Sequence, residues 1–202
     1  MPRSRTSPYS QPDHFTREAK KAGYPARSVF KLEEIDRRIH LLKPGMRVLD
    51  LGASPGSWSL YAAQKIGATG KLLAIDLNPL NTTLPACATF FQGDALSLED
   101  GQVAMFAPYD VVLSDMAPKT TGAKSVDQAR SFELFMRALA VAGSLVRPGG
   151  AFVGKLFMSE ELRTARASLK DLFLEERLIR PEGTRSISTE LFVVGLGRKK
   201  AA

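Results

Sequence analysis

The fold of this chain is decided by the stretch Val48-Leu49-Asp50-Leu51-Gly52-Ala53-Ser54-Pro55-Gly56-Ser57-Trp58-Ser59. An apolar run ends at Asp50, passes into a glycine-rich turn and resumes with helical spacing, which predicts a strand (residues 46–51), a tight loop and a helix start. Glycines adopt backbone angles closed to other residues and let a ligand lie against the main chain, beside the unpaired N–H groups of the helix. We therefore expect Gly52 and Gly56 to hold a nucleotide-like ligand beyond the strand ends of an open α/β sheet.

The loop differs from a dinucleotide fingerprint, because Ser54 stands where Gly-x-Gly-x-x-Gly requires a glycine. Asp50 would repel a pyrophosphate, so it favours a ligand that carries positive charge. S-adenosylmethionine, with an ammonium and a sulfonium, is such a ligand. The alternative interpretation is an ordinary strand-to-helix turn without a ligand.

The composition is that of one soluble domain, with 202 residues, 44% hydrophobic and 24% charged. No apolar run approaches the roughly 18 residues of a membrane span, so no membrane partner is expected. Cys87 has no second cysteine to pair with, and the first six residues lack the apolar core of a secretory signal. We expect a cytoplasmic protein, as a monomer and without a metal.

The positive charge is concentrated near the N-terminus. Residues 1–47 contain 11 Lys and Arg against 5 Asp and Glu, a net charge of +6, whereas residues 48–202 contain 17 against 16, a net +1. Such asymmetry is typical of a surface that binds RNA or DNA. Residues 1–22 are expected to be a basic flexible segment, and residues 23–202 to be the domain. The alternative for the segment is a solvated tail that aids solubility.

Several predicted strands end in a carboxylate. Short apolar runs at residues 71–76, 89–92 and 109–115, separated by helical stretches, predict a doubly wound, mostly parallel sheet. Asp76 has the position from which an acidic residue accepts hydrogen bonds from ribose hydroxyls, and Asp94 and Asp115 would lie at the same rim. A strand-end carboxylate in a turn is the alternative for Asp76.

Two lysines attract attention because of their neighbours. Lys155 lies within an apolar strand at residues 151–157, where an amine is costly to bury. It is either snorkelling at a strand edge or held for a function. Lys31 lies off the apolar stripe of a helix that starts at Ser28, where a solvated lysine is equally consistent with the pattern.

Five stretches, in the same order, resemble the FtsJ family of S-adenosylmethionine-dependent ribose 2′-O-methyltransferases over about residues 24–199. They are Arg27-Ser28-Val29-Phe30-Lys31-Leu32, the stretch from Asp50 to Ser59, Ser114-Asp115-Met116-Ala117-Pro118, Pro148-Gly149-Gly150 with Lys155, and Arg185-Ser186 with Glu190. The resemblance implies a seven-stranded Rossmann-like sheet with a reversed last strand. Ser57 departs from the family pattern, which usually has a second glycine at this position.

The resemblance also implies the site. It assigns a catalytic tetrad to Lys31, Asp115, Lys155 and Glu190, and cofactor contacts to Gly56, Trp58, Asp76, Asp94 and Asp115. The implied reaction transfers a methyl group from S-adenosylmethionine to the ribose 2′-hydroxyl of a uridine in 23S ribosomal RNA, within the large subunit. A sulfonium needs little acid help, so Lys155 is the candidate base and the two carboxylates orient the lysines.

Other functions are kept as alternatives. In one alternative the substrate is another RNA, such as tRNA or a different ribosomal RNA. In another, the chain is a non-catalytic RNA-binding module. Base N-methylation is disfavoured, because Asp115-Met116-Ala117-Pro118 lacks the aromatic residue that would stack on a flipped base. Base C5-methylation needs a thiol nucleophile, and Cys87 lies outside the matched stretches.

Overall fold

The computed structural model describes residues 14–95, 100–182, 184 and 188–200. The first 13 residues of the predicted flexible segment, and the Arg185-Ser186 pair of the last matched stretch, lie outside the described residues.

The strands form one seven-stranded sheet in the order β3-β2-β1-β4-β5-β7-β6. Strands β1 to β5 run parallel to one another, whereas β7 is antiparallel to both β5 and β6. The predicted doubly wound, mostly parallel sheet and its reversed last strand are confirmed. The strands are β1 (Arg47–Leu51), β2 (Lys71–Asp76), β3 (Ala88–Gln92), β4 (Tyr109–Ser114), β5 (Val146–Phe157), β6 (Phe173–Ile179) and β7 (Glu190–Arg198).

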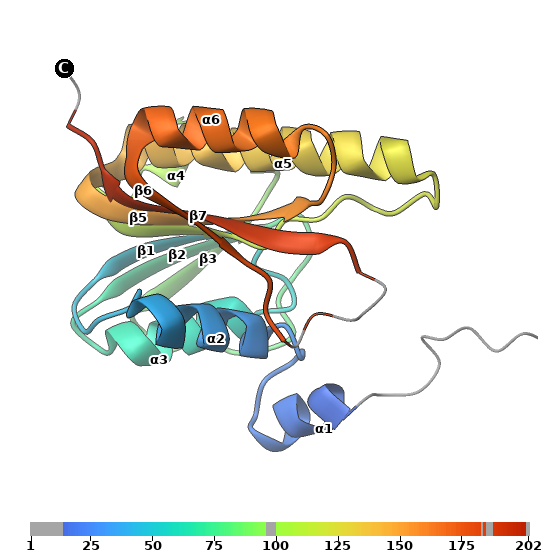
Figure 1. Cartoon of the computed structure of the whole chain (residues 1–202). Helices are drawn as coiled ribbons and strands as arrows, with labels where there is room; N and C mark the ends of the chain where they lie inside the picture. The colour runs from blue at the N-terminus through green and yellow to red at the C-terminus, as the bar shows by residue number, and fades with distance from the viewer. Residues whose placement is uncertain (1–13, 96–99, 183, 185–187, 201–202) are drawn as a thin grey trace, which may run out of the picture.

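Helices cover both faces of the sheet (Figure 1). The helices α2 (Val29–Ile39) and α3 (Ser57–Ile66) lie on one face, and α5 (Lys124–Leu145) and α6 (Leu162–Leu172) lie on the other. Each face has its own apolar core, around Trp58 and Phe192 on the α2 side and around Phe135 and Phe152 on the α5 side. Burial on both faces explains why the central strands read as continuous apolar runs.

The chain changes direction between β1 and β4. From β1 the sheet grows through β2 to β3 on one side, and then from β4 to β5 on the other. In open α/β sheets a ligand binds beyond the carboxyl ends of the strands at this switch point. The loops after β1, β2 and β4 are therefore where the topology places a site.

A helix that the sequence did not predict precedes the domain. Helix α1 (His14–Lys21) lies beyond the start of α2, within the segment expected to be flexible (Figure 1). Ala19 is buried, and the Phe15 ring lies 5.9 Å from the Phe30 ring of α2. These contacts attach an otherwise polar helix to the rest of the chain. The helix has too few apolar residues for its sequence pattern to predict it.

The start of β5 also differs from the prediction. The sequence indicated a stop at residues 147–150, but the strand already begins at Val146, which pairs with Tyr109 before a shift in register. A Cβ on Gly150 would lie 2.7 Å from the Asp110 main-chain oxygen. The glycine therefore permits a close approach within the sheet rather than ending the element. In the described parts of the chain, no helix has the length and apolar character needed to cross a membrane.

Candidate functional site

The two loop glycines are required by the fold itself. Gly52 has a φ of +80°, and a Cβ there would lie 2.7 Å from the Met116 main-chain nitrogen. Gly56 has a φ of +112° where α3 begins, and a Cβ there would lie 2.5 Å from a methyl carbon of Thr82. Left-handed backbone and close contact both select glycine. Because these two positions have no side chain, the loops that contain Met116 and Thr82 can lie against the glycine turn.

A cavity of about 400 Å³ opens at the carboxyl ends of β1, β2 and β4. We call it the Asp76 cavity; its walls include Gly52, Asp76, Asp94, Met116, Lys119 and Arg130. Asp76 accepts hydrogen bonds from the main-chain nitrogens of Ser54 (2.9 Å) and Asn78 (2.7 Å). Its carboxylate therefore fixes the glycine loop against the turn after β2 while it lines the cavity. The structure places Gly52, Asp76 and Asp94, predicted as cofactor contacts, on this cavity.

Asp50 lies fully buried behind the glycine loop. One carboxylate oxygen accepts a hydrogen bond from the Ser59 hydroxyl at 2.6 Å, and the other has no hydrogen-bond partner. Burial, together with repulsion from Asp115 and Asp76, raises the pKa of Asp50 to about 7. Three carboxylates that repel one another around one rim favour a cationic ligand there.

Trp58 is positioned differently from the other predicted cofactor contacts. Its side chain is 2% exposed, its indole N–H donates to the Ser28 main-chain oxygen at 2.8 Å, and its ring lies 5.5 Å from that of Phe192. The indole thus belongs to the core between α2 and β7. What it leaves for a ligand is a main-chain N–H in the first turn of α3, where such groups have no helical partner. Gly56 adjoins this turn rather than the cavity wall.

Lys155 is a held amine rather than a snorkelling one. It is 7% exposed in β5, and its Nζ donates to a carboxylate oxygen of Asp115 at 3.0 Å and to the Asp115 main-chain oxygen at 2.5 Å. Burial of a charged group is tolerated when it is paired and hydrogen-bonded in this way. The end of β4 therefore fixes the amine in place.

Lys31 forms the second ion pair of the rim. Its Nζ contacts a carboxylate oxygen of Glu190, and both side chains are 13% exposed. The Thr184 hydroxyl lies 3.5 Å from the same oxygen. Lys31 is thus not the solvated helix lysine of the alternative interpretation.

The register of the sheet brings the two pairs to one face. Lys155 pairs with Phe192 and Phe157 pairs with Glu190 across β5 and β7. Directly opposed residues of antiparallel strands point to the same face, so Lys155 and Glu190 share the face that α2 covers, where Lys31 lies. The structure therefore brings together all four residues of the predicted tetrad.

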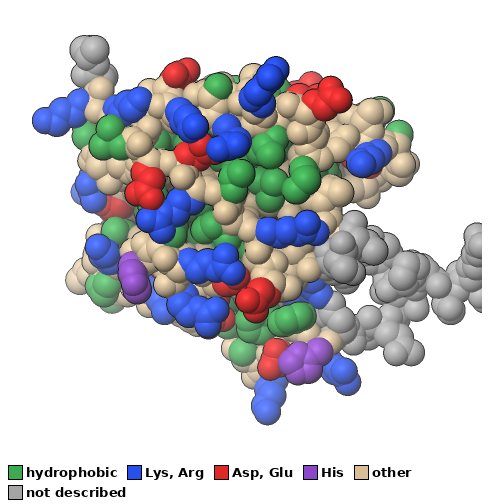
Figure 2. All heavy atoms as spheres, in the orientation of Figure 1, with side chains coloured by type: hydrophobic (Ala, Val, Ile, Leu, Met, Phe, Trp, Pro, Cys, Tyr) green, Lys and Arg blue, Asp and Glu red, His purple; other side chains and the backbone are tan. Residues whose placement is uncertain are grey.

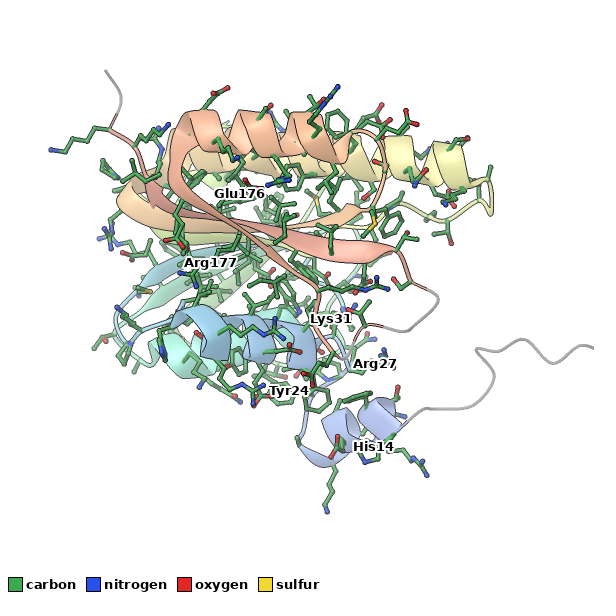
Figure 3. The ribbon with its side chains drawn as sticks, viewed as in Figure 1. His14, Tyr24, Arg27, Lys31, Glu176 and Arg177 are labelled. Atoms are coloured by element: carbon green, nitrogen blue, oxygen red, sulfur yellow. The ribbon has the colours of Figure 1, made fainter. Side chains whose placement is uncertain are left out.

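A second cavity, of about 740 Å³, begins at Lys31 and Glu190. We call it the basic groove; its other walls include Arg27, Thr120, Lys124 and Gln128. Figure 3 shows Arg27 and Lys31 at the same end of α2, and Figure 2 shows several Lys and Arg side chains over α2 on the face in view. Sequence reasoning named Lys31 but missed Arg27, although Arg27 opens a matched stretch, and it missed Lys124 and Gln128, which share one side of α5 at a spacing of four. Within the described residues, no group of three or more His, Cys, Asp and Glu is placed to hold a metal.

Comparison with known proteins identifies the family. The profile of the FtsJ-like methyltransferases matches residues 24–198. The chain belongs to the FtsJ-like methyltransferase family. This finding confirms the resemblance seen in the sequence, and with it the methyltransferase activity.

Relatives of this FtsJ-like methyltransferase align over nearly their whole length. A protein of Sorangium cellulosum named ribosomal RNA large subunit methyltransferase E is 67% identical over 195 residues, which cover 96% of this chain and 92% of that protein. A protein of the same name from Bdellovibrio bacteriovorus is 48% identical and covers 95% of this chain and 99% of its own.

A solved structure supports the fold of this FtsJ-like methyltransferase. It comes from Plasmodium falciparum, and its name assigns it provisionally to the ribosomal RNA methyltransferases. It aligns with a TM-score of 0.75 at 22% identity, covering 88% of this chain and all of that one. At this identity the comparison shows that the architecture is shared.

Proposed function

We propose that this FtsJ-like methyltransferase transfers the methyl group of S-adenosylmethionine to the ribose 2′-hydroxyl of a uridine in 23S ribosomal RNA of the large subunit. The observation that carries the proposal is a set of two lysine–carboxylate pairs. Lys31 and Glu190 line the basic groove, and Asp115, which holds Lys155, directly precedes residues that line the Asp76 cavity. The names of the relatives support ribosomal RNA of the large subunit as the substrate.

The Asp76 cavity fits S-adenosylmethionine. Asp76 would hold the ribose hydroxyls and Asp94 would lie near the adenine, because each follows a strand end at the cavity wall. The unpartnered oxygen of buried Asp50 supports a cationic ligand at the same rim. When bound, the cofactor supplies an electrophilic methyl group on a positively charged sulfur.

The chain contributes alignment and a place for the proton. An ammonium has three N–H donors, and two of those of Lys155 are directed at Asp115. The third is left for the ribose oxygen, so the amine fixes the direction from which that oxygen approaches the cavity. In its neutral form the same nitrogen accepts the hydroxyl proton. Asp115 therefore positions the amine, and Lys155 acts on the hydroxyl.

The basic groove supplies the binding site for the RNA. Arg27, Lys31 and Lys124 present cations along its walls, which suits a phosphate backbone. The Lys31–Glu190 pair lies on the same side of the sheet as Lys155. We therefore expect a nucleotide held in the groove to place its ribose near this amine. One chain provides all four tetrad residues, which supports a monomer. The proposed ribosomal RNA substrate supports action in the cytoplasm, where ribosomes are assembled.

Transfer of a labelled methyl group tests the proposal. The protein is incubated with methyl-labelled S-adenosylmethionine and, in separate reactions, with unmethylated large ribosomal subunits, naked 23S RNA, 16S RNA and tRNA. We expect label in 23S RNA when it is supplied within the large subunit, as naked RNA, or in both of these reactions. Label in tRNA or 16S RNA alone would overturn the proposed substrate. Absence of label in every RNA, with RNA binding retained, would favour the non-catalytic alternative.

A further inference from the structure

One loop forms a wall of both cavities. Residues 116–123, which we call the partition loop, follow the tetrad residue Asp115 directly and lead into α5. Residues 116–119 line the Asp76 cavity, whereas Thr120 and Gly122 line the basic groove. A movement of this loop therefore changes the shape of both cavities.

The partition loop is anchored at its far end by a buried carboxylate. Asp127, in the first turn of α5, is 8% exposed and also lines the basic groove. One of its oxygens accepts hydrogen bonds from the main-chain nitrogen (2.8 Å) and hydroxyl (2.9 Å) of Thr121, and the other accepts one from the Gly122 nitrogen (3.2 Å). Both loop residues are themselves exposed. A single side chain thus fixes an otherwise solvent-facing turn.

The near end of the loop is fixed by the glycine turn. The Asp115 main-chain nitrogen donates to the Leu51 oxygen at 3.1 Å, and Met116 lies where a Cβ on Gly52 would stand. Between the two fixed ends, Ala117, Lys119 and Thr120 are exposed and belong to no helix or strand. A ligand in either cavity would contact this exposed part of the loop and restrict its side chains.

We propose that the partition loop couples the two sites, with Asp127 as its positioning residue, so that cofactor in the Asp76 cavity strengthens RNA binding in the basic groove. The inference rests on the proposed function for the identity of the two ligands. A segment that two ligands both order loses its conformational freedom once, so the second ligand binds more tightly than it would alone. The coupling is reciprocal, since RNA must strengthen cofactor binding by the same factor.

The test compares RNA affinity with and without cofactor product. Filter binding measures the dissociation constant of 23S RNA, naked or in the large subunit, whichever binds more tightly, in the absence and presence of saturating S-adenosylhomocysteine. In the wild-type protein we expect the product to tighten binding by about fivefold or more, the lower end of ordinary coupling between sites. The affinity for S-adenosylhomocysteine, measured with and without RNA, should change by the same factor.

Variants at the anchor sharpen the test. Asp127→Asn replaces an acceptor oxygen by an NH₂ group, which cannot accept the bonds of the loop. Thr121→Val removes the hydroxyl donor and keeps the shape, whereas Thr121→Ser retains the hydroxyl. We expect the coupling factor to fall toward one in the first two variants and to persist in Thr121→Ser. Ser144→Ala is the matched control, because this hydroxyl lies at the far end of α5 and donates to the Ala140 main-chain oxygen one turn earlier.

The outcomes separate this inference from the proposed function. A coupling factor of one in the wild-type protein overturns the inference even when methyl transfer is normal. Unchanged coupling in both Asp127→Asn and Thr121→Val, with normal thermal unfolding, removes Asp127 from its role. If Asp127→Asn fails to fold, Thr121→Val decides. Absence of methyl transfer would count against the proposed function alone, because the coupling is measured by binding.

Discussion

The two cavities beside the partition loop differ in charge. The Asp76 cavity has Asp76, Asp94 and Glu133 against Lys119 and Arg130, with buried Asp50 behind it. The basic groove has Arg27, Lys31 and Lys124 in its walls against Asp127 and Glu190, of which Glu190 pairs with Lys31 and Asp127 accepts hydrogen bonds from the partition loop. The two sites of this rim therefore differ in the sign of their excess charge. The first suits a small cation and the second suits a polyanion.

The largest effect is expected where the two sites adjoin. Lys155→Ala should lower methyl transfer by about 10²–10⁴-fold, the range for a lost general base, because it removes the amine that Asp115 holds. Affinity for S-adenosylmethionine should stay nearly unchanged. Single-turnover rates and calorimetry measure the two quantities, with exposed Lys71→Ala as the control. Near-normal turnover in Lys155→Ala would remove the residue from the mechanism.

Asp76 should affect only the first site. Asp76→Ala is expected to weaken S-adenosylmethionine binding by about 1–3 kcal/mol, roughly 5- to 150-fold, because it loses hydrogen bonds to a charged group. RNA affinity in the absence of cofactor should not change. Calorimetry and filter binding test this contrast, with exposed Asp171→Ala on α6 as the control. Unchanged cofactor affinity would exclude Asp76 from the site.

Removal of the N-terminal segment should affect only the second site. A chain that starts at Gly23 loses α1 with Arg17, Lys20 and Lys21, so its RNA affinity should fall by about tenfold at low salt. The slope of log affinity against log salt should become shallower by roughly 0.7–0.9 for each phosphate that the shortened chain no longer binds. A chain that starts at His14 keeps α1 and separates its effect from that of residues 1–13. Identical affinity and slope in all three chains would make the segment a solubility tail.

The smallest effect concerns the charge of Asp50. Burial raises its pKa to about 7, so the unliganded protein binds this proton more tightly than the unfolded chain does. The stability that results is complete at acidic pH and is lost as the pH rises from about 4 through about 7. The ionised carboxylate then attracts the sulfonium charge. The preference for S-adenosylmethionine over S-adenosylhomocysteine should therefore rise by about fivefold between about pH 6 and about pH 8, which corresponds to ~1 kcal/mol of Coulomb attraction.

Calorimetry with both ligands at the two pH values checks this expectation. In Asp50→Asn the preference should be independent of pH, because the amide does not ionise. Asp110→Asn, whose carboxylate contacts Arg47 and Arg147 at the opposite end of the strands, controls for general effects of charge. A preference that is equally flat in the wild-type protein would show that Asp50 does not sense the sulfonium.

Local patterns were enough to predict a doubly wound, mostly parallel sheet and three carboxylates of its rim, whereas the seven strands and the reversed last strand came from the family resemblance. Strand ends are short apolar runs followed by a carboxylate, so Asp76, Asp94 and Asp115 could be located from sequence. The cost of burying an amine singled out Lys155, and the family resemblance added Lys31 and Glu190. Their pairing depends on the register of β7 against β5 and on the docking of α2, which no local pattern contains.

Tertiary contacts account for what was missed. Asp127 is an ordinary acidic residue in a first helical turn until the loop folds back onto it. Helix α1 depends on the contact of Phe15 with Phe30 rather than on its own pattern. The family resemblance assigned a cofactor contact to Trp58 without naming its atoms, and the packing of its indole in the core depends on how α2 and β7 meet.

The central claim is that the methyl group passes from the Asp76 cavity to a ribose hydroxyl in the basic groove, and alkaline hydrolysis of the labelled RNA tests it most directly. Alkali cleaves RNA through the 2′-hydroxyl, so a 2′-O-methyl group protects the adjacent phosphodiester. We expect the label to be recovered in an alkali-resistant dinucleotide that begins with uridine. Label recovered in mononucleotides, as a methylated base, would contradict the account.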